Sequence, residues 1–191
     1  MKKLFLMAVM ALATVSSFAQ HRVGTVTIQP KVGLSLANVT KGDGDIRVGA
    51  VAGAEFEYQV SDIFSLSAGA LYSMQGCKGE VEGYDATVKL DYLNVPILAN
   101  VYVANGLAVK LGIQPGFNVT SKASVEKSGT KVTTDLDGIE SVDFSIPVGL
   151  SYEINNFVID ARYNLGVSKI MDGSDSKNSV FQLTLGYKFA L

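Results

Sequence analysis

The sequence is poor in the residues that build most catalytic and metal sites. It contains one cysteine, Cys77, and one histidine, His21. A single cysteine excludes an internal disulfide framework and a cysteine-based metal site. His21 precedes the first expected strand and is interpreted as a tail residue, so a Ser-His catalytic pair is excluded. An aspartate-based site stays open, but no pair of carboxylates converges outside the interior charges described below. We expect no enzyme activity, no cofactor and no metal site.

The chain also lacks an excess of positive charge and long apolar runs. It has 16 Lys and Arg against 18 Asp and Glu, whereas a nucleic-acid-binding protein should carry a basic surface. Hydrophobic residues make up 48% of the sequence, yet no run after the N-terminus reaches the length of a transmembrane helix. The apolar residues must therefore be distributed in another pattern.

The N-terminus has the three regions of a secretory signal peptide. Lys2 and Lys3 precede an apolar run at 4–13, and Ser17 and Ala19 occupy the small-residue positions of a cleavage site. We expect residues 1–19 to be removed, which leaves an outer-membrane β-barrel domain at 20–191. Loss of the two lysines leaves 14 basic residues against 18 acidic ones, a net charge of −4.

Apolar and polar residues alternate along the mature chain with the period of a β-strand. The alternation predicts eight strands, at about 28–38, 46–60, 63–76, 87–103, 107–119, 141–153, 157–168 and 181–191. The apolar residues of 88–92 are out of phase with those of 95–103, so we expect a bulge near Tyr92 that restores the register. No helix is expected in the mature chain.

Short and long connections alternate between these strands. The short ones are 60–63, 104–106 and 154–156, and the long ones are 39–45, 77–86, 120–140 and 169–178. An even strand number with short turns at one end and long loops at the other is typical of outer-membrane barrels. The predicted fold is all-β: an eight-stranded antiparallel up-and-down transmembrane β-barrel, with both mature termini on the periplasmic, short-turn side.

The glycines indicate which face of the strands points inward. A soluble barrel would place its apolar row inside, whereas a membrane barrel places that row against lipid and its polar row in the lumen. The polar rows contain nine glycines: Gly33, Gly49, Gly53, Gly69, Gly112, Gly116, Gly149, Gly166 and Gly186. Glycine relieves crowding in the narrow interior of an eight-stranded barrel, but would only weaken a water-facing strand. Aromatic residues near both strand ends also match the two interfacial belts of a membrane barrel.

The polar rows carry charges of both signs. The cations are Lys31, Arg47, Lys110, Arg162 and Lys188, and the anions are Glu55, Glu57, Asp143, Glu153 and Asp160. A solvated sheet face would also mix signs, but these rows hold the glycines as well. Because buried charges must be paired, we expect a structural charge network that fills the lumen and leaves no pore.

Three acidic loop segments, 42–45, 135–138 and 172–175, could bind a divalent cation. None matches the spacing of a calcium-binding loop. Asp and Gly are also the ordinary residues of turns, so we interpret these segments as solvated loops.

Four stretches resemble one family. They are LDYLNVPILANVYV at 90–103, SIPVGLSYE at 145–153, IDARYNLGVSKI at 159–170 and LTLGYKF at 183–189. They are similar to the PorT-like outer-membrane β-barrel family of Bacteroidetes, an OmpA/OmpX-like eight-stranded barrel. The resemblance implies the outer membrane of a Gram-negative bacterium and says little about activity. Members often have an acidic residue where this chain has Asn94.

Two functional hypotheses remain. In the first, the barrel anchors a structural or surface-interaction protein whose extracellular loops, chiefly 120–140, meet partners. In the second, it is an accessory subunit of an envelope secretion or uptake complex. The expected partners are outer-membrane lipid and lipopolysaccharide, a possible envelope protein, and periplasmic chaperones and the barrel-assembly machinery during biogenesis. No nucleic-acid partner is expected.

Overall fold

The computed structural model describes residues 21–40, 45–81, 84–127, 130–136, 138–170 and 176–191. The expected signal peptide, 1–19, lies outside them. The strands are β1 (Val26–Val39), β2 (Asp45–Ser61), β3 (Phe64–Val81), β4 (Tyr84–Asn94), β5 (Ile97–Ala104), β6 (Leu107–Lys127), β7 (Thr130–Asp135), β8 (Val142–Ile154), β9 (Phe157–Gly166), β10 (Asn178–Tyr187) and β11 (Phe189–Ala190).

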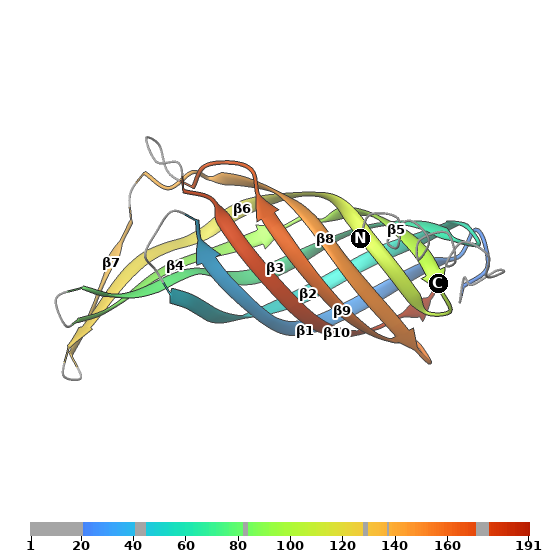
Figure 1. Ribbon diagram of the computed structural model, residues 1–191, viewed down its shortest axis with the longest axis horizontal. Coiled ribbons are helices and arrows are strands. Elements are labelled where there is room, and N and C mark those ends of the chain that lie inside the picture. The colour runs from blue at the N-terminus through green and yellow to red at the C-terminus, as the bar shows by residue number, and fades with distance from the viewer. Residues whose placement is uncertain (1–20, 41–44, 82–83, 128–129, 137, 171–175) are drawn as a thin grey trace, which may run out of the picture.

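These strands form a closed antiparallel ring (Figure 1). β4 with β5 makes one position of the ring, β10 with β11 makes another, and β7 pairs only with β6 outside it. The ring therefore has eight positions and closes where β10 pairs with β1. The final residue is held as well, because the Leu191 N–H donates to the Val26 carbonyl at 2.9 Å. Closure leaves the ring without a free edge strand.

Tight turns join the strands at one end of the barrel, which we call the short-turn end. Asn155 and Asn156 both have positive φ, 47° and 71°, as a two-residue hairpin turn of the primed type requires. Gly106, with φ of 74°, serves the β5–β6 turn. We call the opposite end the long-loop end. The three short connections are where the sequence predicted them.

The ring is apolar outside and polar inside. Outward side chains such as Val32, Leu111 and Leu185 are each more than half exposed, whereas inward Ser35, Ser73 and Asn100 are fully buried. This distribution is the reverse of a water-soluble barrel and follows the pattern of a membrane barrel. Among the described residues, no helix is long and apolar enough to cross a membrane.

Glycine allows adjacent strands to approach closely. A Cβ atom added at Gly33 would lie 2.0 Å from the Leu183 carbonyl oxygen, and one at Gly53 would lie 2.0 Å from the Ala70 oxygen. At these two positions the close contact is with the backbone of the neighbouring strand. Crowding across the lumen, the reason inferred from sequence, is therefore not what these two positions relieve.

Two connections predicted to be loops are largely strand. β3 continues to Val81, β6 continues to Lys127, and β7 lies inside the expected loop 120–140. In register, Lys122 faces Asp135 and Val125 faces Val132. The loop prediction was wrong here because these segments are rich in charged and hydroxylated residues, as loops are. Their backbone hydrogen bonds come from a partner strand, which composition does not reveal. β7 projects beyond the long-loop end (Figure 1).

Two predicted strands are interrupted. The strand at 87–103 breaks at Val95 and Pro96, because proline has no backbone N–H to donate to a ladder. The last strand breaks at Lys188, whose N–H donates to the Asn156 carbonyl at 2.8 Å.

The irregularity expected near Tyr92 is present, but its effect differs from the expectation. Asp91 pairs with Thr120 and Tyr92 with Asn118, so Val119 of β6 is the extra residue. Leu90 and Tyr92 are each only 1% exposed and share the inner face with Asn94. The apolar row of 88–92 therefore faces the interior and was wrongly assigned to the lipid face.

Candidate functional site: the charged barrel interior

Five charged side chains from four strands meet in the middle of the lumen. Lys31 comes from β1, Glu55 from β2, Lys110 from β6, and Asp160 and Arg162 from β9. Strand alternation points all five inward. Four of them face a glycine on a neighbouring strand. Lys31 faces Gly53 and Gly186, and Glu55 faces Gly69. Lys110 and Arg162 both face Gly149. A glycine beside each of these long side chains leaves it room to extend across the lumen.

We call these five residues the central cluster. Lys31 Nζ lies 2.8 Å from Glu55 Oε2 and 3.3 Å from Asp160 Oδ2. Lys110 Nζ lies 2.8 Å from the same Asp160 oxygen. The Arg162 guanidinium lies 2.9 Å from Glu55 Oε1 through Nη1 and 2.9 Å from Asp160 Oδ2 through Nη2. Three cations thus share two carboxylates, which leaves the cluster with one excess positive charge.

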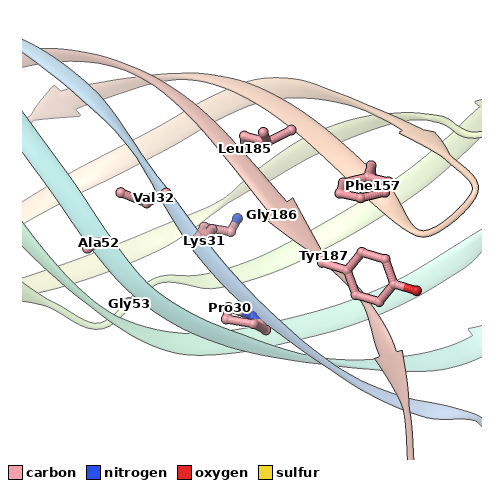
Figure 2. Close-up of a pocket in the computed structure, with 9 residues that line it drawn as sticks. All are labelled: Pro30, Lys31, Val32, Ala52, Gly53, Phe157, Leu185, Gly186 and Tyr187. Atoms are coloured by element: carbon pink, nitrogen blue, oxygen red, sulfur yellow. The ribbon is translucent and has the colours of Figure 1, made fainter.

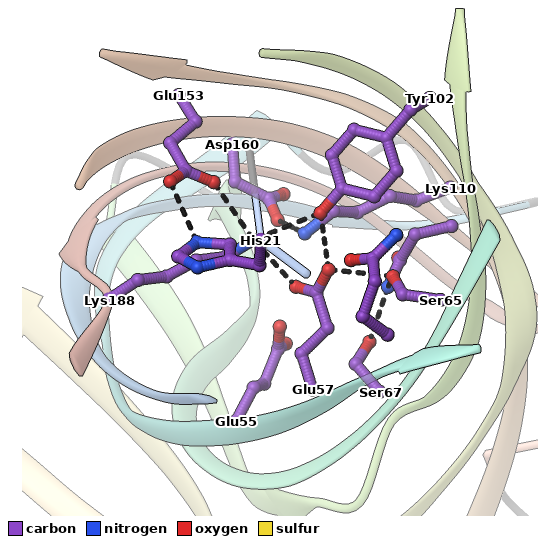
Figure 3. Close-up of polar contacts among 12 residues, drawn as sticks. His21, Glu55, Glu57, Ser65, Ser67, Tyr102, Lys110, Glu153, Asp160 and Lys188 are labelled. Carbon is purple, nitrogen blue, oxygen red and sulfur yellow. Dashed lines mark hydrogen bonds and ion pairs between the residues drawn. The ribbon is translucent and has the colours of Figure 1, made fainter. Parts of the chain in front are cut away.

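A second group, the rim cluster, consists of Glu57, Glu153, Lys188 and His21 (Figure 3). It lies at the short-turn end, where the Lys188 N–H donates to the Asn156 carbonyl and the Glu153 N–H to the Gly106 carbonyl, both at 2.8 Å. Lys188 Nζ lies 2.9 Å from Glu57 Oε2 and 3.0 Å from Glu153 Oε2. Glu57 also accepts hydrogen bonds from the hydroxyls of Ser65, at 2.6 Å, and Tyr102. These two carboxylates and one ammonium carry an excess negative charge, opposite in sign to the excess of the central cluster.

His21 belongs to the rim cluster. Its Nε2 lies 3.0 Å from Glu153 Oε1, and its side chain is 12% exposed. The interpretation of His21 as a free tail residue was therefore wrong. Figure 3 shows its ring beside Glu153 and Lys188. Its position before the first strand gave no sign of this contact in the sequence.

The two remaining predicted charges lie apart from both clusters. Arg47 Nη1 lies 3.0 Å from Asp91 Oδ1, and Asp91 also accepts a hydrogen bond from the Tyr72 hydroxyl at 3.0 Å. Asp143 accepts one from Ser168 Oγ at 2.7 Å. All ten predicted residues are at most 8% exposed. Asp91 lies between the inward Leu90 and Tyr92 and so starts from the outer face of β4, where the Tyr72 hydroxyl reaches it. Sequence reasoning did not include it in the charge network, and it missed Tyr102 because only charges were sought.

The described interior contains charged side chains that are paired with one another. Among the residues that the structure describes, no three His, Cys, Asp or Glu side chains gather in a metal-binding arrangement. The three acidic loop segments lie wholly or partly outside those residues. The charges of both clusters are held by hydrogen-bonded partners, as buried charges require. This geometry suits a structural role.

The outer surface carries a shallow apolar groove of about 470 Å³ over β1 (Figure 2). Its lining residues are Pro30, Lys31, Val32, Ala52, Gly53, Phe157, Leu185, Gly186 and Tyr187. Small residues form its floor, and Phe157 and Tyr187 pack edge to face at one end, with ring centroids 5.0 Å apart. In a bilayer this groove is a surface for lipid chains.

A closed antiparallel ring with an apolar exterior and a charged interior defines a transmembrane β-barrel. The chain belongs to the family of outer membrane protein beta-barrel domains, whose profile matches residues 18–172. The family places the protein in the outer membrane. A search of curated protein sequences finds no match.

Two solved structures have the same fold. One is Ail, the attachment invasion locus protein of Yersinia pestis, with 21% identity, a TM-score of 0.51, and coverage of 88% of this chain and 100% of Ail. The other is neisserial surface protein A, with 17% identity, a TM-score of 0.55, and coverage of 86% and 97%. At these identities the likeness concerns the fold.

Proposed function

We propose that this protein is a membrane-anchored surface-interaction protein. In this proposal residues 1–19 are a cleaved signal peptide, the short-turn end and both mature termini face the periplasm, and the long-loop end faces outward. The observation that carries it is the extension of β3, β4 and β6 beyond the ring, with β7 added to them. A barrel that served only as an anchor would need no ordered sheet there.

The interior supports a role that does not involve transport or catalysis. An eight-stranded barrel leaves an interior only wide enough for side chains. Here that space holds two charge clusters whose members are buried and paired. The proposal therefore includes a plugged lumen and no enzyme activity. The charge network has a structural role, and its partners across four strands fix the barrel's shape.

The comparison structures agree with a surface role. Ail is described as an attachment invasion locus protein and was solved with the heparin analogue sucrose octasulfate, and the neisserial protein is described as a surface protein. Within the outer-membrane family, the four sequence stretches support a finer assignment to the PorT-like group of Bacteroidetes. The proposal assigns this chain no ligand on the basis of either comparison.

Cross-linking on intact cells tests the proposed function. A membrane-impermeant amine cross-linker is applied to cells that carry the parent chain or a variant lacking residues 124–136, and the barrel is then purified in detergent. We expect a cross-linked protein partner with the parent that is lost with the deletion. A stoichiometric partner retained by the deletion variant would instead support the accessory-subunit hypothesis, and absence of any partner would contradict the proposal.

Trypsin added to intact cells tests the orientation. The β6–β7 segment contains Lys122, Lys127 and Lys131. Cleavage in this segment without lysis of the cells is the expected result. Protection in intact cells together with cleavage after lysis would place the long-loop end in the periplasm and refute the orientation.

A further inference from the structure

Part of the inner face of the barrel changes from polar to apolar near the long-loop end, on β1 and β4. Along β4 and β5 the inward residues pass from Asn100 and Asn94 to Tyr92, Leu90 and Val88 without a change of phase. β1 shows the same change, from Lys31 and Ser35 to Ala37 and Val39. This change cannot serve the lipid contact, because all these side chains face inward. It creates an apolar compartment on one side of the lumen, beside the buried polar side chains of Arg47, Gln75 and Asn178.

Described residues that follow β7 and β9 lie over this compartment. Leu136 and Ile139 come from the first segment and Ile170 from the second, and Ile170 is buried against Leu90 and Tyr92. Two backbone hydrogen bonds fix the arrangement. The Glu140 N–H donates to the Ile170 carbonyl at 2.9 Å, and the Ile170 N–H donates to the Ser176 carbonyl at 3.0 Å. Hydrogen bonds therefore join Ile170 to Glu140 and to Ser176, and apolar packing joins Ile170 to the barrel.

The compartment contains a half-open pocket of about 230 Å³. Its lining residues are Val39, Cys77, Val88, Leu90, Leu136, Ile139, Ile170 and Ser176. Among the described residues that line it, none carries a charge, and this part of the lining favours apolar contacts. An engineered apolar cavity of about 150 Å³ binds benzene. A pocket of the present size and lining therefore suits an uncharged molecule of one or two fused rings.

The apolar lining continues toward solvent along the extended sheet. Ala86 lies two residues from Val88 on the same face of β4. In register Ala86 pairs with Val125 of β6, and Val125 pairs with Val132 of β7. Val125 is 42% and Val132 is 62% exposed. The opposite face of these strands is polar, with Ser124 and Thr133 hydrogen-bonded at 3.0 Å. An apolar molecule therefore has a continuous apolar surface from solvent to the pocket.

From this geometry we propose that the long-loop end binds a small, uncharged aromatic molecule in the pocket beneath Ile139 and Ile170. The pocket recognises the ligand by apolar contact and excludes charged molecules, since burial of an unpaired charge there is unfavourable. The site does not depend on the surface-interaction role or on the orientation of the barrel. Its lining residues belong to neither the central cluster nor the rim cluster.

Indole fluorescence provides a direct test, because the chain contains no tryptophan. The folded barrel in lipid nanodiscs is titrated with indole, and empty nanodiscs correct for partition into lipid. We expect a saturable blue shift and rise in anisotropy at one indole per chain. Ile139→Lys should weaken this binding at least tenfold, whereas Ile63→Lys, the same change at the short-turn end, should leave it unchanged. Absence of a saturable component, or equal binding by Ile139→Lys, would overturn the proposal.

Cys77 provides a second measurement that does not require a folded Ile139→Lys variant. Its thiol lies in the pocket wall, so saturating indole should slow its reaction with a charged methanethiosulfonate reagent several-fold in the parent. Ile63→Cys in a Cys77→Ser background is the control, because Ile63 is 52% exposed at the short-turn end, and indole should not change its rate. An unchanged rate at Cys77 would also refute the assignment.

Discussion

Neutralising Asp160 should destabilise the barrel more than any other single change in the central cluster. Asp160 is 1% exposed, and its Oδ2 atom lies within 3.3 Å of the cationic groups of Lys31, Lys110 and Arg162. In Asp160→Asn these three cations would share Glu55 alone. Removing one partner of a buried ion pair typically costs about 3–5 kcal/mol because the remaining charge is uncompensated. We expect a loss of this size in the free energy of unfolding.

A compensating substitution separates charge balance from packing. Asp160 is the ion-pair partner of Lys110, at 2.8 Å, so Asp160→Asn with Lys110→Met restores the original excess of one positive charge. Residues in one network show coupling energies of about 0.5–3 kcal/mol, and we expect the double variant to be more stable than Asp160→Asn by an amount in this range. Urea unfolding in lipid vesicles, followed by circular dichroism and by heat-dependent mobility on gels, gives both values.

Either of two results would show that the buried charges of the central cluster do not stabilise one another. One is an Asp160→Asn barrel within about 1 kcal/mol of the parent, well below the usual cost of a broken buried pair. The other is a double variant whose loss of stability equals the sum of the losses measured for Asp160→Asn and Lys110→Met alone. The two charges would then not act on one another.

Three further predictions follow from the fold. In planar bilayers the folded protein should give no stable open channel, because paired side chains fill the lumen, and sustained conductance steps would contradict this. Gly53→Ala should cost about 1–3 kcal/mol of stability through overpacking, since the added Cβ meets the Ala70 oxygen at 2.0 Å, whereas Gly79→Ala meets no atom within 4 Å and should unfold at the parent's urea concentration. Deletion of 124–136 should leave a heat-modifiable barrel on gels, because it removes the parts of β6 and β7 beyond the ring and Leu136 but none of the paired residues of the ring; a failure to fold in lipid would show that this extension is needed for assembly.

The barrel itself could be predicted from the sequence because its determinants are local. Alternation of apolar and polar residues gives the strands, and Asn155 and Asn156 give a tight turn from their own backbone preferences. The glycines on the polar rows identified the inner face of the strands correctly. At Gly33 and Gly53, however, an added Cβ would contact the neighbouring backbone, so these glycines do not relieve crowding in the lumen.

The details of the interior depend on register and could not be predicted in the same way. Each of the ten charges could be assigned to a polar row, but pairs such as Arg162 with Glu55 depend on strands 107 residues apart in sequence. His21 was missed because its partner, Glu153, lies 132 residues away. The strand β7 was missed because its hydrogen bonds come from β6, while its own residues resemble those of a loop.

The most direct test of the inside-out barrel is a charge placed on its outer face. Leu185 is 51% exposed and lies between Val32 and Ile159 in register. Leu185→Arg should reduce the free energy of unfolding in lipid vesicles by about 2–4 kcal/mol if the side chain faces the bilayer midplane. Val60→Arg, near the short-turn end, should cost only about 0–1 kcal/mol. A Leu185→Arg barrel as stable in lipid as the parent would contradict the account.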